Sequence, residues 1–377
     1  MNLPPLEIPH GIRASGVATR DWLHWALTCL QQEAARSADT HLLKLNFRAF
    51  PDIDFYFKDE AAHPSGSLKH RLARSLFLYA LCNGRLRPGQ LVVDASSGST
   101  AISEAWFARL LGLPFVAVMP ACTAPQKIRA VEALGARCEL VENPCAVRER
   151  AARYVAQGAC FLDQSGLAER ATDWRGNNNI AESIVGQLAR EPSPVPAWIV
   201  CGAGTGGTSA TIGRYLRYSR MYTRLCVAEP RGGAFAAGWR TRDANARASA
   251  ASVIEGIGRP QVEPGFVFDV VDAVLEIDDA ESIAAMGLLG DLLGRRYGGS
   301  SGTNFAACLQ LAAGMRERGE CGSIVSLLCD VGERYERTLF DDGWLAAHGI
   351  DPLPARRRLR AAMHGDASAQ VARLALV

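Results

Sequence analysis

Short apolar runs rich in valine and leucine alternate with helical stretches from about residue 90 onward. Near-continuous apolar strands that alternate with helices are typical of a parallel sheet whose two faces are both covered. Strands are predicted at Leu91–Ala95, Pro114–Met119, Cys138–Val141, Ala159–Leu162, Trp198–Cys201, Leu225–Glu229 and Ile324–Cys329, and earlier at Leu42–Leu45 and Ile53–Phe57.

Helices are predicted between these strands, and a peripheral helix is predicted in the Ala/Arg-rich stretch 352–377. So many strands exceed what one small sheet needs, and we therefore expect an α/β protein with two lobes and a cleft between them. The helix candidates are Ala101–Leu111, Ala124–Leu134, Ala146–Ala156, Asn179–Ala189, Thr208–Tyr218 and Phe305–Ala313.

The composition, with 48% hydrophobic and 21% charged residues, is typical of a soluble globular enzyme. A net charge of +2 gives no strong electrostatic field, so neither nucleic acid nor a membrane is expected as a partner. The first residues lack a basic region followed by an apolar core, so no signal peptide is expected. No apolar run is long enough to span a bilayer.

The chain has 11 cysteines and no CxxC pair. An odd count in a long chain, with many cysteines in apolar surroundings, indicates buried free thiols in a reducing compartment. A cytoplasmic location is therefore predicted. The cysteines in apolar surroundings are Cys82, Cys160, Cys201, Cys226 and Cys329.

Lysine is rare, since only Lys44, Lys58, Lys69 and Lys127 occur in the chain. Lys69 follows the small-residue turn 63–68 and opens an apolar helical stretch. A lysine amine can lose its proton when it is desolvated and can then act as a nucleophile that forms a Schiff base, which arginine cannot do. Taken alone, a surface lysine in a turn is the safer interpretation.

A glycine-rich loop, Gly202–Thr208, follows a predicted strand and opens a helix. Glycine lets the backbone approach a ligand closely, and the N–H groups and dipole of the helix start favour an anion such as phosphate. The loop also loosely resembles a dinucleotide fingerprint, and Glu229 lies at about the distance that such a fingerprint requires. A dinucleotide-dependent oxidoreductase therefore stays open at this point, as does an ordinary tight turn.

Three other small-residue turns accompany this loop. Asp94–Thr100 links a strand to a helix and suits either a carboxylate or an ordinary helix cap. Gly298–Asn304 and Glu255–Gly258 carry no information alone, but glycine and serine loops at the carboxyl ends of parallel strands can face one crevice. The histidines show no metal-ligand spacing and no GxSxG sequence occurs, so neither a metal site nor a serine hydrolase is expected.

In this order and spacing, four segments resemble the pyridoxal-phosphate β-family of fold type II, which includes cysteine synthase and cystathionine β-synthase. The resemblance extends from about Leu42 to about Tyr335. The matching segments are Ser67–Arg71 for the Schiff-base lysine, Gly204–Thr208 for the phosphate loop, Gly299–Gly302 for the loop whose first serine faces the pyridine nitrogen, and Glu255–Gly258 for a loop on the substrate side.

Within this family the chain is most similar to the L-cysteine desulfhydrase branch. Ser99 stands where most of the family has an asparagine that contacts the phenolic oxygen of the cofactor, and Ala101 stands where a glycine is usual. The segments that carry the narrower likeness are Pro64–Arg74, Ser96–Ala101, Ala168–Asn179 and Cys329–Tyr335.

The resemblance implies two three-layer α/β/α lobes with mostly parallel sheets and with pyridoxal phosphate in the cleft between them. It implies a smaller N-terminal lobe, 45–165, with the carboxylate loop, and a larger lobe, 1–44 plus 166–345, with the phosphate loop. A C-terminal extension, 346–377, follows. Members of the family lead us to expect a homodimer that acts on an amino acid.

The resemblance also assigns the site. Lys69 is the expected catalytic residue, which holds pyridoxal phosphate as a Schiff base and then removes the α-proton of the substrate. The expected cofactor-binding residues are Lys69, Ser99, Gly204, Thr205, Gly206, Gly207, Thr208 and Ser300. The expected substrate-binding residues are Ser96, Ser97, Gly98, Thr100, Gln164 and Gly256.

The expected reaction is α,β-elimination of L-cysteine to sulfide, pyruvate and ammonia, as in an L-cysteine desulfhydrase. One alternative is a β-replacement synthase that makes cysteine or a related β-substituted alanine from an activated serine. A second alternative is a non-catalytic protein of the same fold that serves as a binding partner, although the presence of Lys69 speaks against it.

Overall fold

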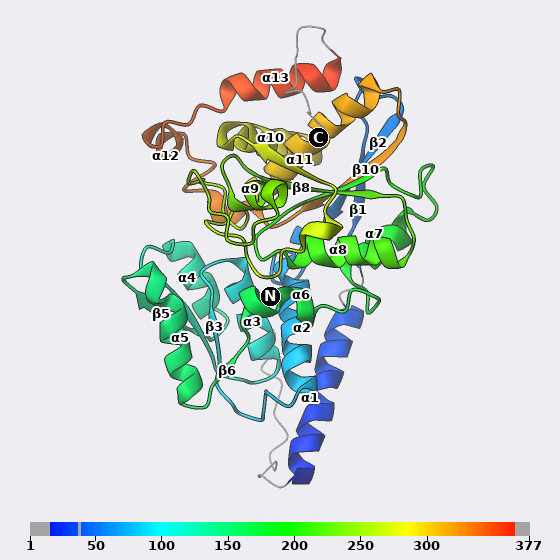
Figure 1. Ribbon diagram of the computed structural model, residues 1–377. Helices are drawn as coiled ribbons and strands as arrows, with labels where there is room; N and C mark the ends of the chain where they lie inside the picture. The colour runs from blue at the N-terminus through cyan, green and yellow to red at the C-terminus, as the bar shows by residue number, and fades with distance from the viewer. Residues whose placement is uncertain (1–15, 37–38, 366–377) are drawn as a thin grey trace. The chain divides into compact units, whose positions relative to one another are not determined.

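The computed structural model describes residues 16–36 and 39–365 (Figure 1). Within this range the chain forms two compact units. Unit 1 contains the described residues of Met1–Asp39 and of His63–Thr172, and unit 2 contains those of Thr40–Ala62 and of Asp173–Val377.

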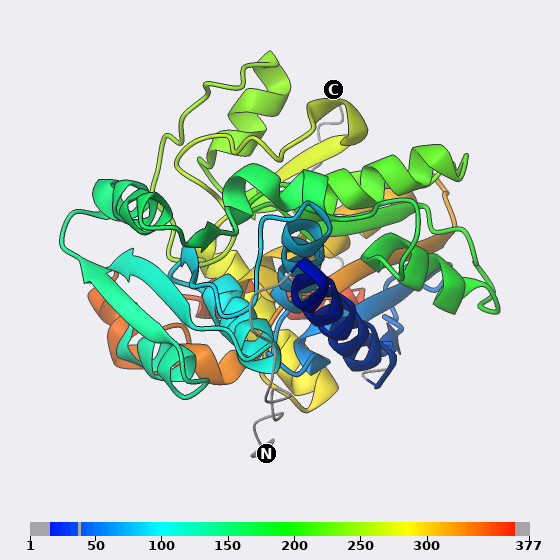
Figure 2. The ribbon, with the colours of Figure 1, turned by 90° about the horizontal axis from the view of Figure 1, so that it is seen from below.

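Unit 1 contains a four-stranded parallel sheet in the order β5-β4-β3-β6. Its helix α1 lies alongside α2 (Figures 1 and 2). The strands are β3 (Val92–Ala95), β4 (Phe115–Pro120), β5 (Arg137–Val141) and β6 (Cys160–Phe161), and the helices are α1 (Gly16–Arg36), α2 (Lys69–Cys82), α3 (Ser99–Leu110), α4 (Pro125–Glu132), α5 (Val147–Ala156) and α6 (Gln164–Ala171).

Helices bury both faces of this sheet. Neighbouring residues along a strand point to opposite sides, so each strand contributes side chains to both faces. On β4, Phe115 and Ala117 pack with α1, α2 and α3, whereas Val116 and Val118 pack with α5. Continuous apolar strands are the result, and they produce the three-layer arrangement that the sequence pattern predicted.

Unit 2 contains a six-stranded sheet in the order β1-β2-β10-β7-β8-β9, parallel except for the β1–β2 pair. Helices α10, α11 and α13 cover one face, and α7 and α8 contact the other (Figure 1). The strands are β1 (Leu42–Leu45), β2 (Ile53–Asp59), β7 (Trp198–Gly202), β8 (Arg224–Pro230), β9 (Ala273–Ile277) and β10 (Gly322–Leu328), and the helices are α7 (Ile180–Leu188), α8 (Gly207–Tyr218), α9 (Ala234–Thr241), α10 (Asp279–Leu293), α11 (Gly299–Glu317), α12 (Asp342–Ala347) and α13 (Leu353–His364).

The division into units differs from the predicted lobes at the start of the chain. The sequence placed residues 1–44 in the larger lobe, but Trp22, Ala26 and Leu30 of α1 pack into the core of unit 1. The sequence also began the smaller lobe at residue 45, but β2 pairs with β10 and belongs to unit 2. The described part of the predicted extension 346–377 packs into unit 2, because Leu359 and Met363 of α13 are buried in its core.

All nine predicted strands are present, and none of their ends differs by more than two residues. Strand β9 and the helices α1, α6, α9, α10 and α12 were not predicted. Four of the cysteines predicted to be buried are buried, but the prediction was wrong for Cys82, which is exposed at the last residue of α2. None of the described helices combines the length and the apolar character needed to cross a membrane.

Candidate active site

Lys69 is the first residue of α2. The chain turns at Gly66, whose φ of +70° lies in the region that favours glycine. The main-chain N–H of Lys69 donates to Oγ of Ser67 at 3.3 Å, and no side chain caps this end of the helix. The lysine therefore stands at a helix start that is surrounded by small residues.

Two of the other lysines join strands to their neighbours in unit 2. Lys58 on β2 is fully buried, and its Nζ donates to the carbonyl of Thr40 at 2.7 Å and to Oε1 of Gln187 at 2.6 Å. Lys44 on β1 pairs with Asp54 at 3.0 Å, and this hydrogen bond raises the pKa of the lysine. Both amines thus have structural tasks.

The imidazole of His70 belongs to a buried chain of hydrogen bonds inside unit 1. Its Nε2 lies 3.0 Å from Oε1 of Glu33 on α1, and its Nδ1 lies 3.0 Å from Oγ of Ser65. Oγ of Ser65 lies 2.8 Å from Oγ of Ser103, which donates to the carbonyl of Ser99 at 3.0 Å. Burial lowers the pKa of His70, and the hydrogen bond to Glu33 opposes this effect. The chain of hydrogen bonds connects α1 to Ser99, the first residue of α3.

The loop 96–100 joins β3 to α3 and was predicted to hold the substrate carboxylate. Helix α3 begins after Gly98 without a side-chain cap. The hydroxyls of Ser96, Ser97 and Thr100 make no side-chain hydrogen bond to any residue that the structure describes. Main-chain N–H groups and hydroxyls at a helix start suit a carboxylate group.

Gln164 lies beside this loop at the start of α6. Its main-chain N–H donates to Oδ2 of Asp94 at 3.2 Å, and its Nε2 donates to the carbonyl of Ala95 at 3.4 Å. Asp94 and Ala95 end strand β3 directly before the loop. Unit 1 thus brings together all the residues that were predicted to bind the substrate carboxylate, although they come from segments about 70 residues apart.

The predicted phosphate loop connects β7 to α8. Gly206 has a φ of +82°, and a Cβ atom at this position would lie 2.4 Å from the main-chain nitrogen of Phe266, so only glycine fits. No side chain caps α8, and the hydroxyl of Thr208 makes no hydrogen bond to the described residues. The first N–H groups of α8 therefore suit an anion.

The loop that contains Gly256 lies next to the phosphate loop in unit 2. The N–H of Gly258 donates to the carbonyl of Ala203 at 3.1 Å. The side chain of Ile257 lies so close to Gly202 that a Cβ atom there would approach it to 2.6 Å. Gly256 itself has a φ of +86°.

Ser300 occupies the first turn of α11 and is 5% exposed. Its hydroxyl makes no hydrogen bond with the described part of the chain, whereas the neighbouring Ser301 accepts the N–H of Cys329 at 2.8 Å. The two serines therefore differ. Ser301 holds the residue that follows β10, whereas the hydroxyl of Ser300 is available for a hydrogen bond to another group.

The donor groups of these loops fit pyridoxal phosphate. In unit 2, the uncapped start of α8 and its glycine backbone supply N–H groups that suit a phosphate dianion. A neutral hydroxyl such as that of Ser300 suits a pyridine nitrogen, and a lysine amine suits an aldehyde. Each of these groups lies at a loop or helix start, where the sequence predicted it.

Glu229 does not have the free carboxylate that a dinucleotide site requires. Its side chain is fully buried and accepts the main-chain N–H groups of Phe235 and Ala236 at the start of α9. Burial raises the pKa of Glu229 to about 7, against the effect of these two hydrogen bonds. The carboxyl group thus caps α9. The position of Glu229 about 20 residues after the glycine-rich loop, which kept the dinucleotide alternative open, is explained by this structural role.

Sequence reasoning missed two buried carboxyl groups beneath the carboxylate loop, Asp94 and Glu104. Asp94 is 1% exposed and Glu104 is 0% exposed. The available signal was an acidic residue inside an apolar strand and another inside an apolar helix, since acidic residues are rarely fully buried. Sequence reasoning also missed Glu33 and Ser103, which belong to the hydrogen-bond chain of His70.

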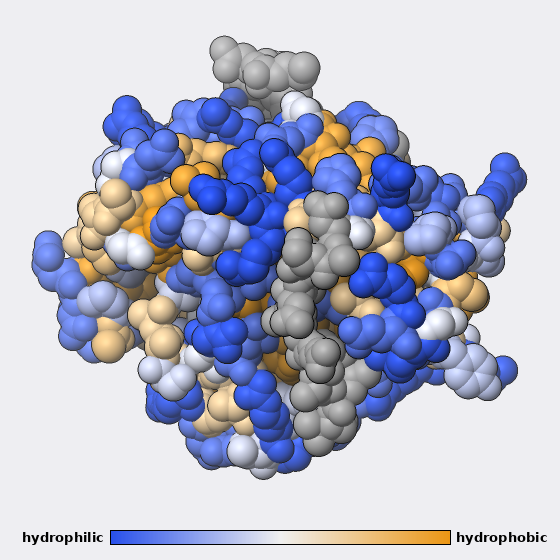
Figure 3. Space-filling view, turned by 90° about the horizontal axis from the view of Figure 1, so that it is seen from above, coloured by the Kyte–Doolittle hydropathy of each residue, from blue (hydrophilic) through white to orange (hydrophobic). Residues whose placement is uncertain are grey.

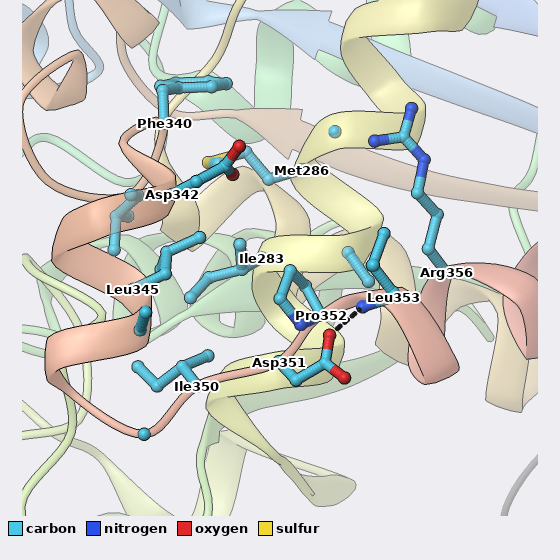
Figure 4. A pocket seen from close by; sticks show the side chains of 15 residues that line it. Ile283, Met286, Phe340, Asp342, Leu345, Ile350, Asp351, Pro352, Leu353 and Arg356 are labelled. Atoms are coloured by element: carbon cyan, nitrogen blue, oxygen red, sulfur yellow. Dashed lines mark hydrogen bonds between the residues drawn. The ribbon is translucent and has the colours of Figure 1, made fainter.

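A cavity of about 610 Å³ lies in unit 2 among α10, α12 and α13 (Figure 4). Its walls are largely apolar, and the side chains of Asp351 and Arg356 at its rim bond to the N–H of Leu353 and to Asp291. The surface of unit 2 on the side of α13 is mostly hydrophilic with apolar patches (Figure 3). None of the predicted site residues lines this cavity. The described residues contain no group of three or more histidine, cysteine or acidic side chains placed to hold a metal.

Comparison with known proteins gives consistent likenesses. The family model described as pyridoxal-phosphate dependent enzyme matches residues 36–330. L-Cysteine desulfhydrase Cds1 of Mycobacterium tuberculosis (strain ATCC 25177 / H37Ra) is 53% identical over 339 residues, which cover 89% of this chain and 92% of that protein. A putative cysteine synthase of Sinorhizobium fredii (strain NBRC 101917 / NGR234) is 32% identical, over 79% of this chain and 87% of that protein.

Among solved structures, O-ureido-L-serine synthase matches with a TM-score of 0.71 at 27% identity, over 81% of this chain and 96% of that chain. These findings confirm the predicted α/β fold of type II and the predicted likeness to the L-cysteine desulfhydrase branch.

Proposed function

Because the chain belongs to the family of pyridoxal-phosphate dependent enzymes, we propose that it is an L-cysteine desulfhydrase. One observation carries this proposal, the 53% identity to an L-cysteine desulfhydrase over 89% of the chain. In the proposed reaction, L-cysteine and water give pyruvate, ammonia and hydrogen sulfide. The Cα–H and Cβ–S bonds break and the sulfur leaves with a proton, and water then replaces the amino nitrogen at Cα, which releases ammonia.

In this proposal Lys69 has two tasks. Its amine would hold the cofactor through the aldehyde carbon, and Nζ, when it is free of the cofactor, would accept the Cα proton of the substrate. Bound pyridoxal phosphate supplies the electron-accepting ring that makes this proton acidic enough to remove. The place of Lys69 at a helix start supports the assignment, and so do the structural tasks of Lys44 and Lys58.

The remaining contacts position the reactants. We assign the cofactor phosphate to the N–H groups and hydroxyls of Gly204, Thr205, Gly206, Gly207 and Thr208, and the ring nitrogen to the hydroxyl of Ser300. Ser99 is assigned to the cofactor ring, and Gly256 to the loop on the substrate side. The substrate carboxylate is assigned to Ser96, Ser97, Gly98, Thr100 and Gln164. Because its hydroxyl is neutral, Ser300 would not strongly protonate the ring nitrogen.

The direct test is to incubate the purified protein and pyridoxal phosphate with L-cysteine alone. Sulfide and pyruvate are expected in equal amounts, and the Lys69→Ala variant is expected to lose this activity. Lys44→Arg is a suitable control, since Lys44 makes an ion pair on β1. Borohydride reduction followed by peptide mapping should place the cofactor on Lys69. Absence of sulfide and pyruvate from the wild-type protein would rule out the desulfhydrase.

β-Replacement is the second candidate, because the chain is also 32% identical to a putative cysteine synthase. This function predicts that O-acetylserine and sulfide give cysteine faster than cysteine is degraded. Comparing the two rates with one preparation separates the candidates.

We also propose a homodimer that acts in the cytoplasm on a free amino acid. Eleven cysteines without a disulfide among them fit a reducing compartment. Light scattering during size-exclusion chromatography tests the dimer, and cell fractionation tests the location.

A further inference from the structure

Two carboxyl groups meet in the interior of unit 1, beneath the loop 96–100. Asp94 lies near the end of β3, and Glu104 lies one turn into α3. Both side chains are almost completely buried, and the two carboxyl groups lie close enough for each to change the pKa of the other. An ionised carboxylate has acceptors only, so two neighbouring carboxyl groups can share a hydrogen bond only when one of them carries a proton.

The surroundings place this proton on Glu104. Neither of its oxygens receives a hydrogen bond from an N–H or O–H donor of the described residues. Asp94, in contrast, accepts the N–H groups of Ala95 at 2.7 Å and of Gln164 at 3.2 Å, which stabilise an ionised carboxylate.

No cation balances the pair, since neither carboxyl group forms an ion pair with a described lysine, arginine or histidine. Asp163, directly before α6, raises the pKa of Asp94 and is itself paired with Arg148 of α5 at 3.1 Å. Burial, with Asp94 beside it, raises the pKa of Glu104 well above its ordinary value. A second negative charge in this dry interior would be strongly unfavourable.

We propose that Glu104 is a positioning residue that stays protonated at neutral pH and donates to Asp94, and so fixes the substrate-binding loop and Gln164. The side chain of Asp94 joins the end of β3 to the start of α6, and Glu104 adds α3 to this junction. These three elements carry every group assigned to the substrate carboxylate, so the role in substrate binding rests on the proposed function. The protonated pair itself does not.

Infrared spectroscopy tests the proton directly. The difference spectrum between the wild type and Glu104→Gln at pH 7 should contain the carbonyl stretch of a protonated carboxylic acid. Wild-type protein alone, titrated from pH 6 to pH 8 in steps of about one unit, should keep this band while exposed carboxyl groups are ionised. A missing acid band overturns the proposal. This measurement uses no substrate, so its outcome is independent of the proposed function.

Kinetics test the positioning role. Glu104→Gln keeps a donor to Asp94 and should leave the KM for L-cysteine within about twofold of the wild type, whereas Glu104→Leu keeps the volume but removes the donor and should raise KM about tenfold with kcat nearly unchanged. Val131→Ala, a core change on α4 away from the pair, is the control for lost stability. Equal KM values for Glu104→Leu and Val131→Ala would overturn the role, and so would a failure of Glu104→Gln to rescue binding.

Discussion

Nε2 of His70 lies 3.0 Å from Oε1 of Glu33, and both side chains are buried. The pair begins a hydrogen-bond chain that continues through Ser65 and Ser103 to the carbonyl of Ser99. This chain links α1 to His70, the residue after Lys69, and to Ser99 at the start of α3. Helix α1, which supplies none of the residues assigned to the site, thus has a physical connection to the segment that we assign to substrate binding.

Replacing Ser103 with alanine should weaken substrate binding without unfolding the protein. The change removes the donor to the carbonyl of Ser99 and one partner of Ser65. The loss of one neutral hydrogen bond is worth about 1 kcal/mol, or about fivefold in kcat/KM. Ser75→Ala is a matched control, because Ser75 donates to the carbonyl of Arg71 within α2. Equal kcat/KM for the two variants would show that the chain has no influence on the loop.

His70 should make the protein less stable in mild acid. Burial lowers its pKa below the ordinary value of 6.5, so below that pH the unfolded state binds a proton that the folded state does not. Stability should therefore fall as the pH drops below 6.5, by up to about 1.4 kcal/mol per pH unit. Urea unfolding at pH 5, 6 and 7 measures this slope. His70→Asn should flatten it, and an unchanged slope in that variant would exclude His70 as the cause.

Glu229 should have the opposite effect on stability. Burial raises its pKa from 4.5 to about 7, so between these values the folded state binds more protons than the unfolded state. The stability that this proton provides is present below pH 4.5 and is lost as the pH rises to 7, in total about 3 kcal/mol. Glu229→Gln should remove this dependence. Glu320→Gln is the contrasting control, because Arg318 lowers the pKa of Glu320. A wild-type slope in Glu229→Gln would contradict the assignment.

Gly206→Ala should damage the phosphate loop more than its backbone angle alone predicts. The new Cβ atom would lie 2.4 Å from the nitrogen of Phe266, in a backbone with a φ of +82°. Gly84→Ala is the matched control, because its φ is +67° but no atom lies within 4 Å of the added carbon. We expect a loss of about 1 kcal/mol for Gly84→Ala and of about 3 kcal/mol or more for Gly206→Ala, with weaker cofactor binding in the latter only. Thermal unfolding and cofactor absorbance measure both effects.

The sequence predicted the fold well where the pattern is local. Strands such as β7 and β8 are continuous apolar runs, and their ends were predicted to within one or two residues. Strand β9, at the edge of its sheet, was missed because Glu276 interrupts its apolar run. The apolar face of α1 shows that it packs against a core, but a periodic pattern cannot show which core that is.

The site residues could be predicted because they lie in loops, where glycine and serine at strand-to-helix junctions are recognisable in the sequence. The buried polar interactions beneath these loops have no such sequence signal. Asp94 and Glu104 are 10 residues apart in the chain, yet only the folded structure brings their carboxyl groups together in a region without a cation. The same holds for Glu33 and His70, which come from different helices.

The pairing of β2 with β10 constrains the order in which the chain can fold during translation. Residues 53–59 find their parallel neighbour only when residues 322–328 have been synthesised. All the described segments of unit 1 are complete by residue 172, so they can collapse first while the early β1–β2 hairpin still lacks its sheet. Throughout most of translation the nascent chain therefore has an unpaired strand edge, which chaperones would have to protect.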